Sequence, residues 1–159
     1  SAVTGATWEV IDLMRGIWTV PRSRAGTKLT QEEHRVPLSG RVLEIVRNLP
    51  RIEGNPHVFV GAIDSMGLSN MAMLELLQGR YPQFTVHGFR SSFKDWASEA
   101  TNFPNTVSEM ALAHVVKGAV EAAYRRGDLF EKRRKLMDAW AGYCSRSHVL
   151  AKIIPLKTA

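Results

Sequence analysis

The sequence predicts one domain of the mixed α+β class, mainly α-helical with a small antiparallel β-sheet of about three strands. Two short runs rich in β-branched and aromatic residues lie near the N-terminus, whereas most of the later chain carries apolar residues at helical spacing. The 159 residues match the usual size of one domain, and a hydrophobic content of 45% is enough to build a core. We therefore assign residues 1–159 to a single domain.

The strands are expected near the N-terminus. Residues 17–20 and 34–38 form the two β-branched runs, and together they predict an antiparallel hairpin. The connection between them, residues 21–33, is long and basic, a combination that is often functional. Residues 57–60 predict a third short strand.

Caps, breakers and apolar spacing predict the first two helices. Ser39 offers an N-cap, and Pro50 stops the amphipathic helix that follows it. A second helix is expected from about Ser69 to a stop at Gly79. Beyond that point the chain is expected to be mostly helical.

Three of the later helices are marked by proline, glycine and apolar spacing. Pro104 suits the first turn of one helix, and Gly118 opens a short Ala-rich helix that ends at Gly127. The last amphipathic helix begins with a basic run, residues 132–135, which is either a solvated face or a contact to a DNA backbone. Its stripe consists of Phe130, Arg133, Met137, Trp140 and Cys144, of which Met137 and Trp140 serve either packing on the domain itself or docking on a neighbouring protomer.

Charge and cysteine content narrow the class of protein. Lys and Arg outnumber Asp and Glu by 21 to 15, and the resulting pI near 9.8 favours a polyanionic partner such as nucleic acid. Cys144 is the single cysteine, which excludes an internal disulfide and a Cys-based zinc site and fits a reducing cytoplasm. The sequence shows neither a long apolar span nor a secretory signal pattern, so we expect no contact with a membrane.

The segment from Thr85 to Arg90 carries the most informative polar pattern. His87 and Arg90 are three residues apart, so on a helix they lie one above the other and point at one spot. Such a pair can hold a phosphate, because a guanidinium binds it with a planar fork and an imidazole accepts a proton or donates a hydrogen bond. Ser91 and Lys94 fall on the same polar face, beside an apolar stripe of Phe89, Phe93, Trp96, Ala97 and Ala100.

Two further segments follow this pair in a characteristic order. Leu112-Ala113-His114 comes next, and Tyr124-Arg125-Arg126 begins ten residues after His114. Together with residues 18–21, 34–39, 86–93 and 123–126, this order resembles the tyrosine recombinases of the phage-integrase family, in particular prophage integrases that integrate at tRNA genes. The resemblance covers nearly the whole chain and implies the catalytic-domain fold of that family.

The resemblance also implies roles for five residues. Tyr124 is the expected nucleophile, and Arg90 is the expected clamp on the scissile phosphate. His87 is then the general base or a phosphate ligand, and His114 is a further phosphate donor. Lys28, the only lysine in the connection 21–33, is expected to protonate the leaving 5′-hydroxyl group.

One member of the family's residue set has no counterpart. The family places another Arg in an Arg-x-x-Glu motif just upstream of the position of Val3, and no residue of this chain fills it. We therefore expect an N-terminally truncated catalytic domain without this Arg and without the upstream DNA-binding domains. Because loss of a charge clamp on a transition state commonly costs orders of magnitude in rate, the chain alone is expected to be inactive or nearly so.

The implied chemistry is physically coherent. A phenol, with an ordinary pKa of about 10, is a poor nucleophile at neutral pH, so its attack on a phosphodiester needs a base and nearby cations. The product is a 3′-phosphotyrosyl linkage, which conserves the bond energy for a second strand to attack. We expect no cofactor, and no metal, because His87 and His114 have no carboxylate or cysteine partners at ligand spacing.

Each candidate also has a structural alternative when taken singly. Tyr124 is then a packing residue, His114 a satisfied core histidine, Arg90 and Lys94 a solvated helix face, and Lys28 a loop lysine. Order, spacing and flanking residues occur together, however, and this favours the catalytic interpretation. The remaining histidines, His34, His57 and His148, have no such support and are interpreted as structural or surface residues.

The expected function is site-specific cleavage and rejoining of DNA, for integration and excision of a mobile element. The expected partners are double-stranded attachment sites that hold four protomers, with a monomer or weak oligomer in the absence of DNA, in the cytoplasm of a bacterial host. Two alternatives share the fold: an inactive DNA-binding remnant, and a type IB topoisomerase-like enzyme. A general RNA-binding module would require aromatic stacking platforms, which the sequence does not show.

Overall fold

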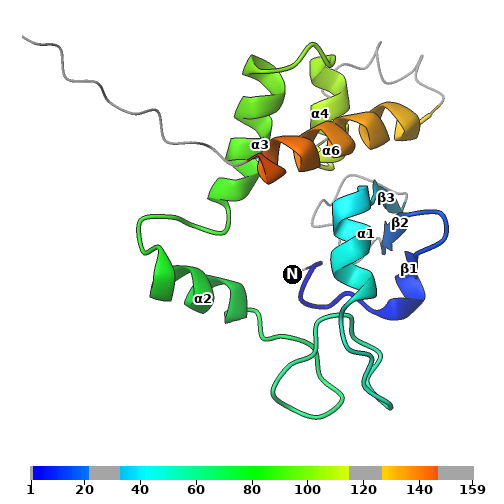
Figure 1. Ribbon diagram of the computed structural model, residues 1–159, viewed down its shortest axis with the longest axis vertical. Coiled ribbons are helices and arrows are strands. Elements are labelled where there is room, and N and C mark those ends of the chain that lie inside the picture. Colours follow the sequence, from blue (N-terminus) through cyan, green and yellow to red (C-terminus); the bar gives the residue numbers. More distant parts are fainter. Residues whose placement is uncertain (1, 22–32, 115–126, 147–159) are drawn as a thin grey trace, which may run out of the picture.

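The computed structural model describes residues 2–21, 33–114 and 127–146. Within these ranges it contains five α-helices, one short 3-10 helix and a three-stranded antiparallel sheet, which confirms the predicted mixed and mainly helical class (Figure 1). In chain order the elements are η1 (Trp8–Val10), β1 (Ile11–Asp12), β2 (Ile17–Val20), β3 (His34–Pro37), α1 (Gly40–Arg47), α2 (Ala72–Arg80), α3 (Gly88–Glu99), α4 (Asn105–Ala111) and α6 (Phe130–Ser145).

The sheet has the order β1-β2-β3, and both pairs of neighbours are antiparallel. Strands β2 and β3 form the predicted hairpin, in a register that pairs Trp18 with Val36 and Val20 with His34. His34 therefore lies at the end of the hairpin where the connection between the two strands begins and ends.

The third strand is not the predicted one. Residues 57–60 make only isolated bridges, such as that between Thr7 and His57, and β1 instead forms the edge of the sheet. Val58 is nevertheless 1% exposed, and its amide donates to the carbonyl of Ala6 at 2.9 Å. The apolar run indicated a buried segment but not a strand, because a short apolar run is found both in buried strands and in other buried segments.

Helix α1 begins as predicted. Ser39 is its N-cap, and the amide of Val42 donates to Ser39 Oγ at 3.4 Å. The helix ends at Arg47 with Asn48 as its C-cap, so the α-helix stops slightly before the expected limit at Pro50.

Helix α2 departs further from the prediction. It begins at Ala72 rather than at Ser69, and it runs through Gly79 to Arg80. A glycine costs a helix only about 1 kcal/mol relative to alanine, so Gly79 by itself was not a sufficient stop signal. None of the residues of α2 is buried, and Figure 1 shows the helix standing apart from the other helices.

A first hydrophobic core joins helices α3, α4 and α6, which we call the helical half. Its buried members are Phe93, Ala97, Val107 and Leu136. Trp96 and Trp140 pack against this core with their ring centroids 4.9 Å apart. Met137 and Trp140 therefore pack on their own domain, which decides between the two uses that the sequence left open.

The apolar stripe predicted on α3 is only partly buried. Phe93 and Ala97 reach the core, but Phe89 is 62% exposed and Ala100 is also exposed. Phe89 lies at the start of α3 and Ala100 directly after its end, so only the middle of the stripe is covered by other helices.

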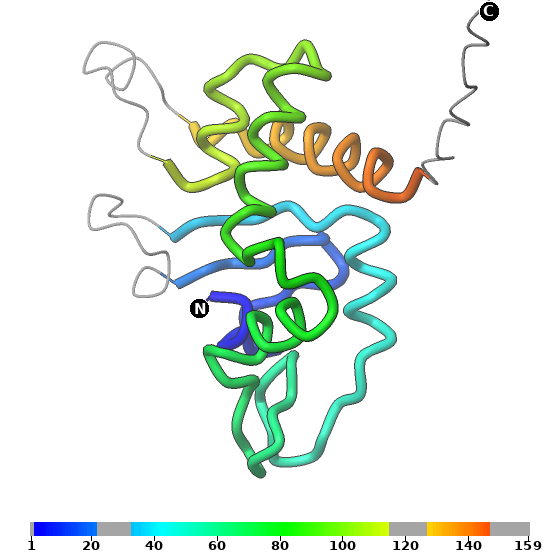
Figure 2. Tube along the Cα trace, turned by 90° about the vertical axis from the view of Figure 1, so that its left-hand side faces the viewer, coloured from blue at the N-terminus to red at the C-terminus, as the bar shows by residue number. Residues whose placement is uncertain are grey.

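A second core belongs to the N-terminal part of the chain, residues 2–20 and 34–60, which we call the sheet half. Ala6, Val46 and Val58 are its buried members, and Trp8 and Trp18 pack against them. Figure 2 shows the helical half stacked on the sheet half, with β3 nearest to α6. None of the described helices is long and apolar enough to cross a membrane.

Candidate functional site

The predicted H-x-x-R pair lies at the start of α3. His87 directly precedes the first helical residue and has helix-like backbone angles, φ −67° and ψ −30°. The amide of Gly88 donates to Thr85 Oγ1 at 3.1 Å, and the amide of Arg90 donates to the His87 carbonyl at 3.0 Å. These bonds fix the first turn, so that His87 is exposed and Arg90 is partly buried.

A Schellman motif positions His114 after α4. Ala113 adopts a left-handed φ of 53°. The amide of Ala113 donates to the Met110 carbonyl at 3.1 Å, and the amide of His114 donates to the Glu109 carbonyl at 2.9 Å. This pair of bonds defines the motif, in which the residue with positive φ ends the helix.

The motif places His114 outside helix α4, which ends at Ala111. The side chain of His114 is 42% exposed, so its interpretation as a core histidine is wrong. Pro104 lies directly before the first helical residue of α4, one position earlier than the predicted first turn.

Arg90 ties α3 to the segment that carries His114. Its guanidinium Nη2 donates to the carbonyl of Leu112. As a result His87, Arg90 and His114 line one pocket of about 220 Å3, although they come from two separate segments of the chain. The other residues that line this phosphate-site candidate are Ser91, Lys94, Asp95 and Leu112.

Glu109 pairs with two of the residues that line this pocket, Lys94 and His114. Lys94 Nζ lies 2.6 Å from Glu109 Oε1, and His114 Nδ1 lies 2.7 Å from Glu109 Oε2. The hydrogen bond from Lys94 is the largest influence on the pKa of Glu109 and lowers it; burial opposes this effect, and the hydrogen bond with His114 adds to it. Lys94 is therefore part of an ion-paired cluster and not of a freely solvated helix face.

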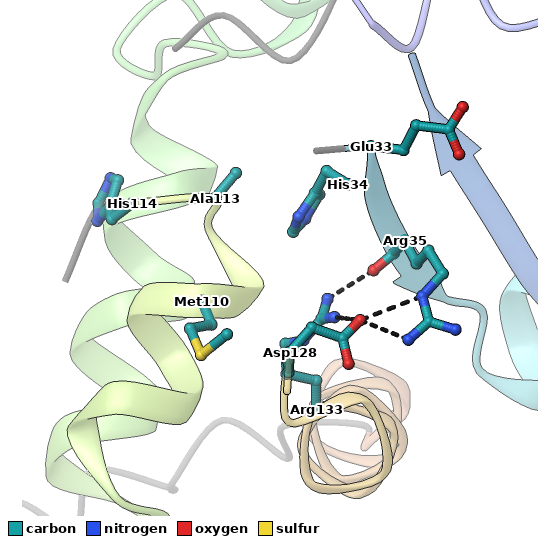
Figure 3. A pocket seen from close by; sticks show the side chains of 8 residues that line it. All are labelled: Glu33, His34, Arg35, Met110, Ala113, His114, Asp128 and Arg133. Carbon is teal, nitrogen blue, oxygen red and sulfur yellow. Dashed lines mark hydrogen bonds and ion pairs between the residues drawn. The ribbon is translucent and has the colours of Figure 1, made fainter. Parts of the chain in front are cut away.

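His114 also lines a second pocket, of about 130 Å3, between β3 and the helical half (Figure 3). The residues around it are Glu33, His34, Arg35, Met110, Ala113, His114, Asp128 and Arg133. Because His114 belongs to both pockets, this second pocket extends the phosphate-site candidate towards the hairpin.

His34 is a pocket residue that sequence reasoning missed. Burial lowers its pKa most, and the positive charges of Arg133 and Arg90 lower it further, against the opposing influences of the Ala111 backbone and Asp128. The imidazole is therefore neutral near neutral pH. The sequence did offer one indication of this role: His34 directly follows the connection 21–33, which carries Lys28, the predicted acid.

A buried arginine joins the two halves beside this pocket. Arg133 is 1% exposed, which agrees with its place on the stripe of the last helix and not with a solvated face or a DNA contact of the basic run 132–135. Its Nη1 donates to the carbonyl of Arg35 at 2.5 Å, and its Nε donates to the carbonyl of Asp128 at 2.8 Å. Both Arg133 and Arg35 also donate to Asp128 Oδ2, each at 2.8 Å.

The charge of Asp128 is maintained by this network. Burial alone would raise the pKa of its carboxyl group, but the hydrogen bond from Arg35 and the charges of Arg133 and Arg35 lower it more. The carboxylate therefore stays ionised and holds strand β3 to the start of α6. Within the basic run, Lys132 and Lys135 remain exposed.

Two of the five predicted catalytic residues, Tyr124 and Lys28, lie outside the described residues, as does most of the short helix predicted from Gly118 to Gly127. The other three are together in one pocket. Among the described residues no group of three or more His, Cys, Asp or Glu side chains could hold a metal ion.

The chemistry available to the described residues is anion binding. A guanidinium has five N–H donors, and Arg90 uses Nη2 on Leu112, so further donors remain for a ligand. Lys94 adds positive charge and Asp95 adds negative charge to the lining of this pocket. His87, Arg90 and His114 together offer hydrogen-bond donors that one anionic group could share.

Curated relatives match most of this chain. It is 35% identical over 143 residues, 86% of the chain, to a prophage integrase, IntA, of Escherichia coli K12. It is 27% identical over 155 residues, 87% of the chain, to the integrase of Enterobacteria phage P4, and 30% identical over 142 residues, 86% of the chain, to the integrase of Shigella phage Sf6.

The match concerns only part of each relative. The chain covers 33% of the Escherichia coli protein, 35% of the P4 protein and 36% of the Sf6 protein, about a third of each. No protein-family model and no solved structure matches the chain. The relatives, which agree with one another in being integrases of phages and prophages, support an integrase family for this chain.

Proposed function

We propose that this chain is the catalytic domain of a tyrosine recombinase that cleaves and rejoins DNA at specific sites. The observation that carries the proposal is the shared pocket of His87, Arg90 and His114. The packing of α3 against α4 brings the start of one helix beside the end of the other, and His87, Arg90 and His114 are the basic residues that these two ends place in one cavity. Their convergence, in a chain similar to phage integrases, supports a phosphate site.

The first step of the reaction is attack by the phenol oxygen of Tyr124 on the phosphorus of the scissile phosphodiester. His87 takes the phenol proton, while Arg90 and His114 hold the non-bridging oxygens, on which negative charge accumulates. The bond from phosphorus to the 5′-oxygen breaks, and Lys28 gives that oxygen a proton. The DNA is then joined to the protein by a 3′-phosphotyrosyl bond and carries a free 5′-hydroxyl group.

Rejoining reverses this step with a different strand. A 5′-hydroxyl group attacks the phosphotyrosyl bond and releases Tyr124, so that the number of phosphodiester bonds is unchanged. Because each cleavage conserves its bond energy, the reaction consumes no nucleotide. In the full-length natural protein we infer double-stranded attachment sites as the substrate, four protomers as the active assembly, and the cytoplasm of a bacterial host as the setting.

The test uses the full-length natural protein on attachment-site DNA that carries a nick to trap the cleaved state. We expect a covalent protein–DNA adduct on a denaturing gel from the wild type and none from Tyr124→Phe. Tyr81→Phe is the matched control, because it removes the same hydroxyl group from an exposed residue outside the pocket, and it should form the adduct normally. Specific DNA binding without any adduct would contradict the catalytic role and leave a DNA-binding remnant of the same fold.

A further inference from the structure

Glu109 uses its two carboxylate oxygens on two different residues of the phosphate-site candidate. Oε2 lies 2.7 Å from Nδ1 of His114, and Oε1 lies 2.6 Å from Nζ of Lys94. The side chain of Glu109 is 24% exposed, against 42% for that of His114. Glu109 is thus the less exposed partner of the pair.

The backbone brings this pair together. In a Schellman motif the residue after the one with positive φ lies over the helical residue five positions earlier, and a hydrophobic contact frequently joins the two. Here those two positions are His114 and Glu109. The usual apolar contact is replaced by a hydrogen bond from an imidazole to a carboxylate, which packing alone does not require.

Helix α3 fixes the carboxylate from the other side. Lys94 Nζ lies 2.8 Å from Ser108 Oγ and also donates to the side-chain oxygen of Asn105. Ser108 is itself 2% exposed. Lys94 is therefore held at two points on α4 besides Glu109, so the carboxylate has little freedom to turn away from His114.

The direction of the hydrogen bond follows from charge. Lys94 and His114 lower the pKa of Glu109, although burial opposes them, so its carboxyl group is ionised near neutral pH. An ionised carboxylate only accepts hydrogen bonds, so Nδ1 of His114 must carry the proton. Nε2 is then the ring nitrogen left to contact a ligand in the pocket that His114 shares with His87 and Arg90.

We propose that Glu109 is a positioning residue, which holds His114 with Nδ1 protonated and Nε2 directed at the bound phosphate, and that Lys94 fixes Glu109 in this task. The role rests on the proposed function, because it concerns the same phosphate. A carboxylate that accepts a hydrogen bond from one ring nitrogen sets the tautomer and the orientation of the ring, as partners of ligating histidines do in other sites. Glu109 thereby keeps Nε2, and not Nδ1, available to the phosphate.

Two measurements test this role. The first is the 15N spectrum of His114, recorded on the chain with labelled histidine at a pH where the ring is neutral. In the wild type we expect the proton on Nδ1, and in Glu109→Gln a shift of the proton towards Nε2. The second is the rate of adduct formation by the full-length protein, which should fall about 10- to 100-fold in Glu109→Gln, as is typical when a residue that orients a functional histidine is lost. Glu99→Gln removes the same charge from an exposed site on α3 and should change neither measurement.

A double-mutant cycle separates positioning from general damage to the fold. If Glu109 acts through His114, Glu109→Gln should cost nothing further in a His114→Asn background. An equal loss of rate in both backgrounds would overturn the proposal, as would a Glu109→Gln protein with an unchanged His114 spectrum. If the wild type forms no adduct that depends on Tyr124, the recombinase assignment fails instead, and the 15N spectrum still decides whether Glu109 orients His114.

Discussion

The helical half and the sheet half of this chain hold their pocket residues in different ways. In the helical half, Val107 and Leu136 are completely buried, and backbone motifs at the ends of α3 and α4 set the directions of His87 and His114. In the sheet half, the pocket residue His34 pairs with Val20 at the end of the hairpin where the two strands are connected. The helical half therefore carries a preformed part of the site, whereas the sheet half contributes through one strand.

Polar side chains connect the two halves. Arg133 passes from α6 to β3, and Asp128 receives hydrogen bonds from both Arg133 and Arg35. Asp128 also lies four residues after Tyr124 in the sequence. Asp128, close in sequence to the predicted nucleophile, is thus hydrogen-bonded to residues of both halves.

The largest effect is expected from the core of the helical half. Leu136→Ala should lower the free energy of unfolding by about 2–5 kcal/mol, the usual cost of removing a fully buried leucine side chain. Leu76→Ala is the matched control on α2, where the leucine is 63% exposed, and it should change stability by no more than about 0.5 kcal/mol. Urea unfolding followed by circular dichroism measures both.

If both leucine variants lost a comparable free energy of unfolding, the distinction between the buried core of the helical half and the exposed helix α2 would be wrong. Such a result would mean that Leu76 is covered in solution, for example by another part of the natural protein. A loss from Leu136→Ala alone would confirm that stability is concentrated in the helices that carry His87, Arg90 and His114.

A smaller effect is expected at the junction of the halves. Arg133→Met should cost roughly 1–3 kcal/mol, because the carbonyl groups of Arg35 and Asp128 lose their donor in a buried place. Lys132→Met, at the exposed neighbouring position of the same basic run, should stay within about 0.5 kcal/mol of the wild type. The same urea titration checks both variants.

The sign of the Arg133 result sharpens the comparison. Replacement of a buried charge network by an apolar side chain sometimes stabilises a protein, because desolvation of the charges is costly. A gain in stability from Arg133→Met would therefore show that apolar packing holds the halves together. Arg133 would then serve to orient β3 and not to bind it.

Local patterns predicted the hairpin and the first turn of α1 because each depends on a few neighbouring residues. Ser39 could be recognised as a cap in the sequence, and the structure shows the hydrogen bond that this cap makes. The third strand was predicted wrongly, since the burial of Val58 depends on Ala6, a residue far away in the chain. A contact with a residue so distant in sequence cannot be predicted from a short stretch of the chain.

The same distinction applies to the candidate site. The spacing of His87 and Arg90 predicted that they share a face, because helical geometry alone determines it. The exposed position of His114 could not be predicted, since it depends on the positive φ of a residue, Ala113, that rarely adopts one. The partnership of His114 with Glu109 was missed for the same reason.

The smallest effect is expected at that unusual residue. Alanine in the left-handed region costs about 1–2 kcal/mol, whereas glycine adopts it readily but loses more entropy on folding, so Ala113→Gly should stabilise the chain by about 0.5–1 kcal/mol. Ala111→Gly, two residues earlier at the end of α4, makes the same change at a helical φ and should destabilise by about 0.5–1 kcal/mol. Opposite signs in thermal unfolding would show that the Schellman turn, and with it the contact of His114 with Glu109, persists in solution. If both variants destabilise, residue 113 does not keep its left-handed conformation, and the helical half is less firmly preformed than its geometry indicates.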